Sequence, residues 1–169
     1  MPVLWTLIFC FFTLSCDNGI KVQETSITGK VIGIKDGDTI DILFNGKSLT
    51  VRLAHIDCPE KSQAFGKNAK QFTSDKCFGE IVKVNSDNKF DRNGRLIGVV
   101  LNQNGENINK ELVKAGLAWF YYKYSTDTSY SFLEQGARQK RIGIWSETDP
   151  IPPWDYRKKS KKVVIHETP

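Results

Sequence analysis

Apolar and polar residues alternate between residues 27 and 56, as they do in half-buried β-strands. The alternation runs over residues 39–44 and returns over residues 48–53, with Asn45-Gly46 between them. Asn-Gly between two alternating segments is a strong β-hairpin signal. An Asp-Gly turn at residues 35–38 follows an earlier apolar segment that includes Val31 and Ile32. The pattern therefore predicts three antiparallel strands in about thirty residues.

The spacing of apolar residues changes after residue 60 and predicts a helix. Phe65, Ala69 and Phe72 occupy one helical face, and Gly79 follows as an end signal. Strands are predicted near residues 81–84 and 96–101, on either side of a turn at Asp91-Arg92-Asn93-Gly94.

Two more helices are predicted, one over residues 108–115 before Gly116 and one over residues 130–141. The aromatic segment 117–124 fits either a short strand or a packed loop, and Ile144-Trp145 is expected to return to the core. Three strands, a helix and two strands follow the chain order of a five-stranded OB-fold barrel. The pattern also fits an SH3-like barrel or an α+β sandwich.

The N-terminus has the features of an export signal. Residues 3–14 are almost entirely apolar, and no charged residue occurs before Cys16. Twelve residues are too few to cross a bilayer, which takes about 20, but they suit the apolar region of a signal peptide. Ser15-Cys16 resembles the lipobox of bacterial lipoproteins, in which the cysteine is lipidated. Ordinary secretion after cleavage and an uncleaved anchor are the alternatives, and all three place the protein outside the cytoplasm.

The chain is thus divided into a lipoprotein-type signal peptide (1–16), a tether (17–26), one folded domain (27–146) and a basic tail (147–169). We expect an extracytoplasmic protein, anchored to a membrane through Cys16 or else secreted or periplasmic. The formal net charge is +5, and residues 150–169 hold five basic and two acidic residues, a balance of 5 − 2 = +3. We expect a flexible, solvated tail. Binding of the tail to a phosphate backbone or an acidic surface is the alternative.

Candidate chemistry is concentrated in three short stretches, residues 36–39, 52–60 and 91–95. Together they supply several carboxylates and the guanidiniums of Arg52 and Arg95, at strand ends or turns. Each stretch alone is explained by a turn, a helix cap or a hairpin tip. Their combination favours a functional site.

In this combination the sequence resembles the staphylococcal nuclease (thermonuclease) family over about residues 27–145. The matching stretches are Asp36-Gly37-Asp38-Thr39, Val51-Arg52-Leu53, Ile56-Asp57-Cys58-Pro59-Glu60, Asp91-Arg92-Asn93-Gly94-Arg95, Gly116-Leu117-Ala118 and Ile144-Trp145. The resemblance implies an OB-fold barrel with three helices, and Ca²⁺-dependent cleavage of DNA and RNA that leaves 3′-phosphate ends. It implies a monomeric catalytic domain.

The resemblance also assigns roles to individual residues. Asp38 and Asp57 are similar to the carboxylate ligands of the calcium ion, and Cys58 to the residue that supplies a backbone carbonyl. Glu60 resembles the carboxylate that positions or deprotonates the attacking water, and Arg52 and Arg95 resemble the pair that binds the scissile phosphate. The remaining assignments are nucleotide contacts for Tyr122 and Tyr124, and support of the metal ligands for Asp36 and Thr39.

Elementary chemistry agrees with these roles. Ca²⁺ takes oxygen ligands, so two aspartates and a carbonyl suit it without histidine. Two guanidiniums can stabilise the charge that grows on a phosphate in the transition state. Since simple alternation puts Arg52 and Asp57 on opposite faces of one strand, the strand has to end or bulge near Ile56.

Two departures from the family concern substrate affinity: Asn93 replaces an aromatic residue, and loop 61–64 is short. A nucleic-acid-binding barrel without catalysis is one alternative, but such domains usually lack some of the five carboxylates and arginines that are all present here. An envelope structural lipoprotein is the other alternative.

Export also bears on the cysteines of the folded domain. Outside the reducing cytosol, Cys58 and Cys77 are candidates for a disulfide. Seven extended residues before the predicted helix could run back along it to bring the two thiols together. Two buried free thiols are the alternative.

Overall fold

The computed structural model describes residues 25–166, with side chains described as far as residue 159. The predicted signal peptide (1–16), Cys16 and most of the tether lie outside the described residues. Within the described part of the chain, no helix is both long and apolar enough to cross a membrane.

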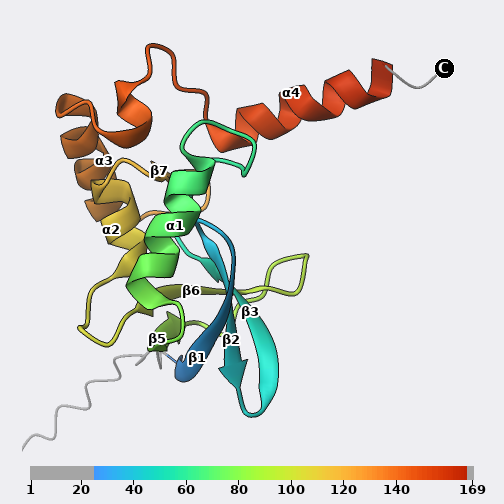
Figure 1. Ribbon diagram of the computed structural model, residues 1–169, viewed down its shortest axis with the longest axis vertical. Coiled ribbons are helices and arrows are strands. Elements are labelled where there is room, and N and C mark those ends of the chain that lie inside the picture. The colour runs from blue at the N-terminus through green and yellow to red at the C-terminus, as the bar shows by residue number, and fades with distance from the viewer. Residues whose placement is uncertain (1–24, 167–169) are drawn as a thin grey trace, which may run out of the picture.

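Five strands close into a barrel in the order β1-β2-β3-β6-β5 (Figure 1). The strands are β1 (Thr25–Asp36), β2 (Thr39–Phe44), β3 (Lys47–Leu53), β5 (Ile81–Ser86) and β6 (Leu96–Leu101). Four of the five pairings are antiparallel, and β3 pairs with β6 in parallel. The predicted OB-fold is therefore confirmed, and β1 begins two residues before the expected start of the domain.

The predicted alternation fills the barrel. Most side chains at the alternating apolar positions are almost completely buried, as Ile40, Ile42, Val51, Leu53, Val82 and Val84 show, whereas Phe44 and Leu49 are partly buried. Asn45 and Gly46 both adopt positive φ angles of 49° and 75° in the β2–β3 hairpin. This left-handed conformation is the one that a tight hairpin turn requires.

Helices cover one end and one side of the barrel, and a two-stranded sheet connects them to it (Figure 1). The helices are α1 (Gly66–Cys77), α2 (Ile108–Lys114), α3 (Ser129–Gln139), the 3₁₀ helix η1 (Gly143–Ser146) and α4 (Pro153–His166). The small sheet pairs β4 (Ile56–Asp57) with β7 (Trp119–Phe120). The aromatic segment after residue 117 thus begins with a short strand.

Most of the segment after residue 146, expected to be a tail, is helical. Helix α4 occupies residues 153–166, which makes it a fourth α-helix where three were expected. Trp154 in its first turn stacks on Tyr121 with ring centroids 5.2 Å apart and meets Trp119 edge-on at 5.7 Å. This aromatic contact attaches the start of the helix to the domain.

The predicted disulfide is also contradicted, because Cys58 and Cys77 are both buried free thiols. A Cβ at Gly37 would lie 2.9 Å from Sγ of Cys58 and 2.6 Å from Cβ of Ala69, so Cys58 packs beside the first half of α1. Cys77 lies eight residues beyond Ala69, about 12 Å along the helix. Its thiol instead donates to the Thr73 carbonyl at 3.0 Å.

Candidate active site

The turn between β3 and β4 brings Arg52 and Asp57 to the same side of the chain. His55 has a φ angle of 70° there, and β3 ends at Leu53 before β4 begins at Ile56. The backbone N–H of Ala54 donates to the Gly98 carbonyl at 2.8 Å, which fixes the turn on β6. The predicted interruption of the strand near Ile56 is confirmed. It allows a salt bridge of 2.8 Å between Arg52 Nη2 and Asp57 Oδ1.

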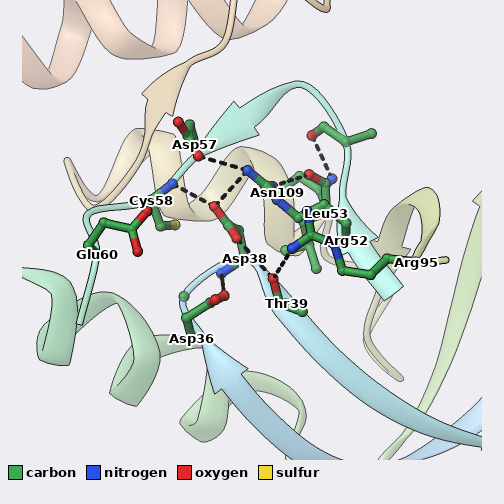
Figure 2. A network of polar contacts seen from close by, with 12 residues as sticks. Asp36, Asp38, Thr39, Arg52, Leu53, Asp57, Cys58, Glu60, Arg95 and Asn109 are labelled. Carbon is green, nitrogen blue, oxygen red and sulfur yellow. Dashed lines mark hydrogen bonds and ion pairs between the residues drawn. The ribbon is translucent and has the colours of Figure 1, made fainter. Parts of the chain in front are cut away.

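Asp38, in the turn between β1 and β2, faces this pair (Figure 2). Its Oδ2 accepts a hydrogen bond of 2.6 Å from the Cys58 backbone N–H and lies 3.1 Å from Arg52 Nη2. Asp36 supports the turn, because its Oδ1 accepts from the Asp38 N–H at 3.1 Å. The resemblance assigned a backbone carbonyl of Cys58 to the metal. In the structure Cys58 is adjacent to Asp38, but the contact with Asp38 is made by the Cys58 backbone N–H.

The charged side chains of Asp38, Arg52 and Asp57 are almost completely buried. The exposed fractions are 13% for Arg52, 7% for Asp38 and 3% for Asp57. Burial raises the pKa of Asp38 from 3.8 to about 7, although the charge of Arg52 opposes the shift. One buried guanidinium is therefore shared by two carboxylates, and this excess of negative charge suits a bound cation.

Arg95 reaches the same place from the hairpin between β5 and β6. Asp91 holds its guanidinium, with a 2.7 Å salt bridge to Arg95 Nη2, and also accepts from the backbone N–H groups of Asn93 and Arg95. Arg95 Nη1 is 3.4 Å from Thr39 Oγ1, and that hydroxyl donates to Asp38 Oδ1 at 3.2 Å. Thr39 therefore connects the second arginine to the buried carboxylates.

Glu60 lies further out, and its partner was not expected from the sequence. Arg157 of helix α4 donates from Nη1 to Glu60 Oε1 at 2.7 Å and from Nη2 to Asp57 Oδ2 at 2.8 Å. Glu60 and Arg157 are 38% and 40% exposed. No local signal indicated Arg157, because it is one of several basic residues in a tail that looked flexible.

One cleft of about 1010 Å³ joins these groups. It is lined by Asp38, Arg52, Asp57, Glu60, Arg95 and Arg157. Tyr124 also lines the cleft, as expected, but Tyr122 does not, and its half-exposed ring meets Trp154 at 6.0 Å. Tyr121 lines the cleft instead. Of the two tyrosines that the resemblance assigned to the nucleotide, only Tyr124 thus lies at the cleft.

Asn109 is a second residue that sequence analysis missed. It is completely buried at the start of α2, where its Oδ1 accepts from the Val100 N–H and its Nδ2 donates to the Ala54 and Gly98 carbonyls. It therefore ties the β3–β4 turn, which begins just after Arg52, to β6 (Figure 2). One sequence signal could have found Asn109: it is a polar residue next to the apolar helix positions Ile108 and Leu112, where a buried polar group needs hydrogen-bond partners.

The donor atoms suit a hard cation such as calcium, because the buried groups are carboxylates and backbone oxygens. Within the described part of the chain, however, no three His, Cys, Asp or Glu side chains converge closely enough to form a ready-made metal site. The carboxylates are held by arginines instead. The Cys58 thiol is no candidate nucleophile, because burial raises its pKa well above the usual range.

Comparisons with known proteins agree with this architecture. Residues 50–147 match the family model described as staphylococcal nuclease homologue. A Haemophilus influenzae protein named uncharacterized endonuclease is 44% identical over 160 residues, covering 94% of this chain and 86% of its own. A Shigella flexneri protein named micrococcal nuclease is 43% identical over 145 residues, covering 80% of this chain and 83% of its own.

An Escherichia coli protein named uncharacterized endonuclease is 40% identical over 131 residues, covering 78% of this chain and 85% of its own. The family model covers more than half of the chain, and these relatives are matched over most of their length. The chain therefore belongs to the staphylococcal nuclease family.

Proposed function

We propose that this protein is a calcium-dependent endonuclease that hydrolyses phosphodiester bonds of DNA and RNA and leaves 3′-phosphate ends. The observation that carries the proposal is the convergence of Asp38, Arg52, Asp57, Glu60 and Arg95 on one cleft. The names of the Shigella and Escherichia relatives support the nuclease activity.

Calcium would be held by Asp38, Asp57 and the Cys58 carbonyl, and when bound it polarises a phosphoryl oxygen and orients a water. Glu60 takes the proton from that water as it attacks phosphorus, and the bond to the 5′-oxygen breaks. The leaving oxygen takes a proton from solvent, so the products are a 3′-phosphate end and a 5′-hydroxyl end. The Glu60 carboxylate is 38% exposed, so a water molecule can reach it.

Arg52 and Arg95 bind the non-bridging phosphate oxygens from two directions. Arg52 is fixed by a buried network, including a 2.8 Å hydrogen bond from Nη1 to the Leu53 carbonyl, and Arg95 is fixed by Asp91. Donors held in place before the reaction stabilise growing charge without reorganising. A barrel that only bound nucleic acid would not need Glu60 beside this pair.

The test is cleavage of labelled DNA and RNA oligonucleotides by the purified protein with Ca²⁺ or with EGTA, followed by analysis of the product ends. We expect calcium-dependent cleavage and 3′-phosphate products. Glu60→Gln should lower single-turnover cleavage by ~10²–10⁴, the usual contribution of a positioned general base.

Glu147→Gln is the matched control, since Glu147 is an exposed carboxylate outside the cleft. Binding of oligonucleotides without cleavage in either cation condition would replace the endonuclease by a nucleic-acid-binding barrel. Cleavage by Glu60→Gln within a few-fold of wild type would assign the general base to another group.

We also propose that Cys16 is lipidated and holds the domain at the outer side of a membrane. The apolar segment before Ser15-Cys16 supports this proposal. Cys16→Ala should move nuclease activity from the membrane fraction to the soluble fraction in cells that express the full chain. Activity that is already soluble in wild type would favour plain secretion.

A further inference from the structure

Helix α4 places the guanidinium of Arg157 against two carboxylates that the proposed mechanism requires, Asp57 and Glu60. We propose that Arg157 occupies Asp57 and Glu60 in competition with calcium, so that the turn of α4 that carries Arg157 has to leave the cleft before the metal binds. The inference rests on the proposed function, because it concerns calcium at this site.

The oxygen atoms of Asp57 show the competition most directly. Its Oδ1 lies 2.8 Å from Arg52 Nη2 and 3.3 Å from Arg157 Nη1, and its Oδ2 lies 2.8 Å from Arg157 Nη2. Both oxygens of a 3% exposed carboxylate are thus engaged by guanidiniums. Because Arg52 already holds Oδ1, the release of Arg157 is what frees Oδ2 for a metal ion.

Glu60 is held by the same guanidinium. Its Oε1 accepts from Arg157 Nη1 at 2.7 Å. The forked guanidinium therefore bridges the carboxylate assigned to the metal and the carboxylate assigned to the water. A docked Arg157 leaves neither group in the state that hydrolysis requires.

The attachment of α4 allows the turn that carries Arg157 to move while the first turn stays in place. Trp154 stacks on Tyr121, and Gln63 donates to the Ile151 carbonyl just before the helix. The short 61–64 loop thus holds the beginning of α4. The same loop also contacts Tyr156, whose hydroxyl lies 3.1 Å from Ser62 Oγ. Beyond this first turn the helix extends away from the barrel (Figure 1).

Arg157 lies three residues after Trp154, so a change confined to the turn that carries it separates its guanidinium from the carboxylates. The Lys158 side chain that follows pairs with Asp155 of the same helix at 2.9 Å. Lys158 therefore makes its ion pair within α4, whereas Arg157 makes its ion pairs across the cleft.

Competition between two cations for one site is reciprocal. Calcium should loosen the docking of Arg157, and loss of Arg157 should tighten calcium binding by the same coupling. If Arg157 is undocked in about one tenth of the molecules, the apparent dissociation constant for calcium is about tenfold weaker than the intrinsic one. Displaced by calcium, the guanidinium is free to face the substrate phosphates.

Calorimetric titration of Ca²⁺ into wild type, Arg157→Ala and Lys158→Ala tests the inference without substrate. Arg157→Ala should bind calcium at least about tenfold more tightly than wild type. Lys158→Ala removes one positive charge from the next position and should stay within about twofold, because an exposed charge is screened. This control separates competition from a change in net charge.

Hydrogen exchange of the wild-type amides at residues 155–159, with and without Ca²⁺, supplies a second measurement. Displacement predicts faster exchange in calcium. The same amides in Arg157→Ala should exchange quickly under both conditions. A purely electrostatic effect of Arg157 on the metal would leave the wild-type exchange unchanged.

The outcomes separate the two proposals. Calcium binding that is equal or weaker in Arg157→Ala, or a loss of oligonucleotide affinity without a change in calcium affinity, overturns the competition and keeps the calcium site. Calcium binding by neither wild type nor Arg157→Ala overturns both. Calcium binding by Arg157→Ala but not by wild type supports both the calcium site and the competition.

Discussion

The two halves of the cleft differ in how firmly the fold holds them. In the inner half, Arg52 bridges Asp38 and Asp57 with at most 13% of any of these side chains exposed. In the outer half, Glu60 and Arg157 form an ion pair with about two fifths of each side chain exposed. Asp57 belongs to both halves, because it contacts both arginines.

This difference shows how one site combines rigidity with exchange. The inner ion pairs are surrounded by barrel strands and a backbone network, so they fix the geometry for phosphate and metal. The outer pair is solvated and depends on a helix beyond the barrel, so a cation or substrate can replace it. Ion pairs of the first kind are costly to break singly, and those of the second kind contribute little stability.

The largest difference between the halves should appear when each arginine is removed. Arg52→Ala leaves two buried carboxylates without their shared partner and should lower the free energy of unfolding by about 3–5 kcal/mol. Arg157→Ala removes a partly exposed guanidinium and leaves Asp57 paired with Arg52, so it should lower the free energy of unfolding by about 1 kcal/mol or less. Urea unfolding of both variants checks this, and equal losses would contradict the division into two halves.

The next largest effect concerns the inner network behind Arg52. Asn109→Ala leaves the Val100 N–H and the carbonyls of Ala54 and Gly98 without this partner. Unfolding free energy should fall by about 2 kcal/mol or more. Single-turnover cleavage should fall too, because the turn after Arg52 loses its support.

Asn107→Ala is the matched control for Asn109→Ala. Asn107 caps α2 by accepting from the Lys110 N–H at 3.0 Å. Its loss should cost about 1 kcal/mol of stability. Because the cap does not contact the β3–β4 turn, cleavage should stay at the wild-type rate. Normal cleavage by Asn109→Ala would limit that residue to a structural role.

A smaller effect is expected from protonation of His55 in the β3–β4 turn. Burial lowers the pKa of His55 below its ordinary 6.5, and its ring nitrogen Nδ1 lies 2.8 Å from Ser125 Oγ. The folded state therefore favours the neutral ring. The stability from His55 is fully present above pH 6.5 and is lost as pH falls from there through the lowered folded pKa.

His55→Asn tests this pH dependence, since asparagine tolerates the left-handed conformation at residue 55. Unfolding free energies between pH 5 and pH 8 should fall less steeply on acidification in His55→Asn than in wild type. Parallel curves for the two proteins would contradict the assignment.

The smallest effect is expected for the exposed lysines of α4. Lys158→Ala and Lys159→Ala should change unfolding free energy by less than about 0.5 kcal/mol, as exposed substitutions usually do. Cleavage of a short oligonucleotide at physiological salt should stay within about twofold, because exposed charges are screened within ~8 Å. A several-fold loss would show that α4 contacts the substrate.

The strand patterns together with the family resemblance predicted the barrel, and the resemblance named the residues of the inner half of the site. Strands β2 and β3 were readable because period-2 alternation and Asn45-Gly46 are local signals. The residues of the inner half, Asp38, Arg52 and Asp57, were found because they lie in short motifs that resemble a known family. The interruption near Ile56 was predicted because alternation alone would have separated Arg52 from Asp57.

The outer half of the site and the residue that supports the inner half, Asn109, became visible only once distant segments were packed together. Arg157 lies 100 residues from Asp57 along the chain, and nothing in a basic tail distinguishes it from neighbouring lysines. Asn109 likewise acts on a turn 55 residues away. The thiols of Cys58 and Cys77 remain apart because helix α1 separates them, a matter of packing direction and not of chain length. Local patterns specify strands and turns because those depend on neighbouring residues, whereas contacts between distant segments depend on how the finished elements pack.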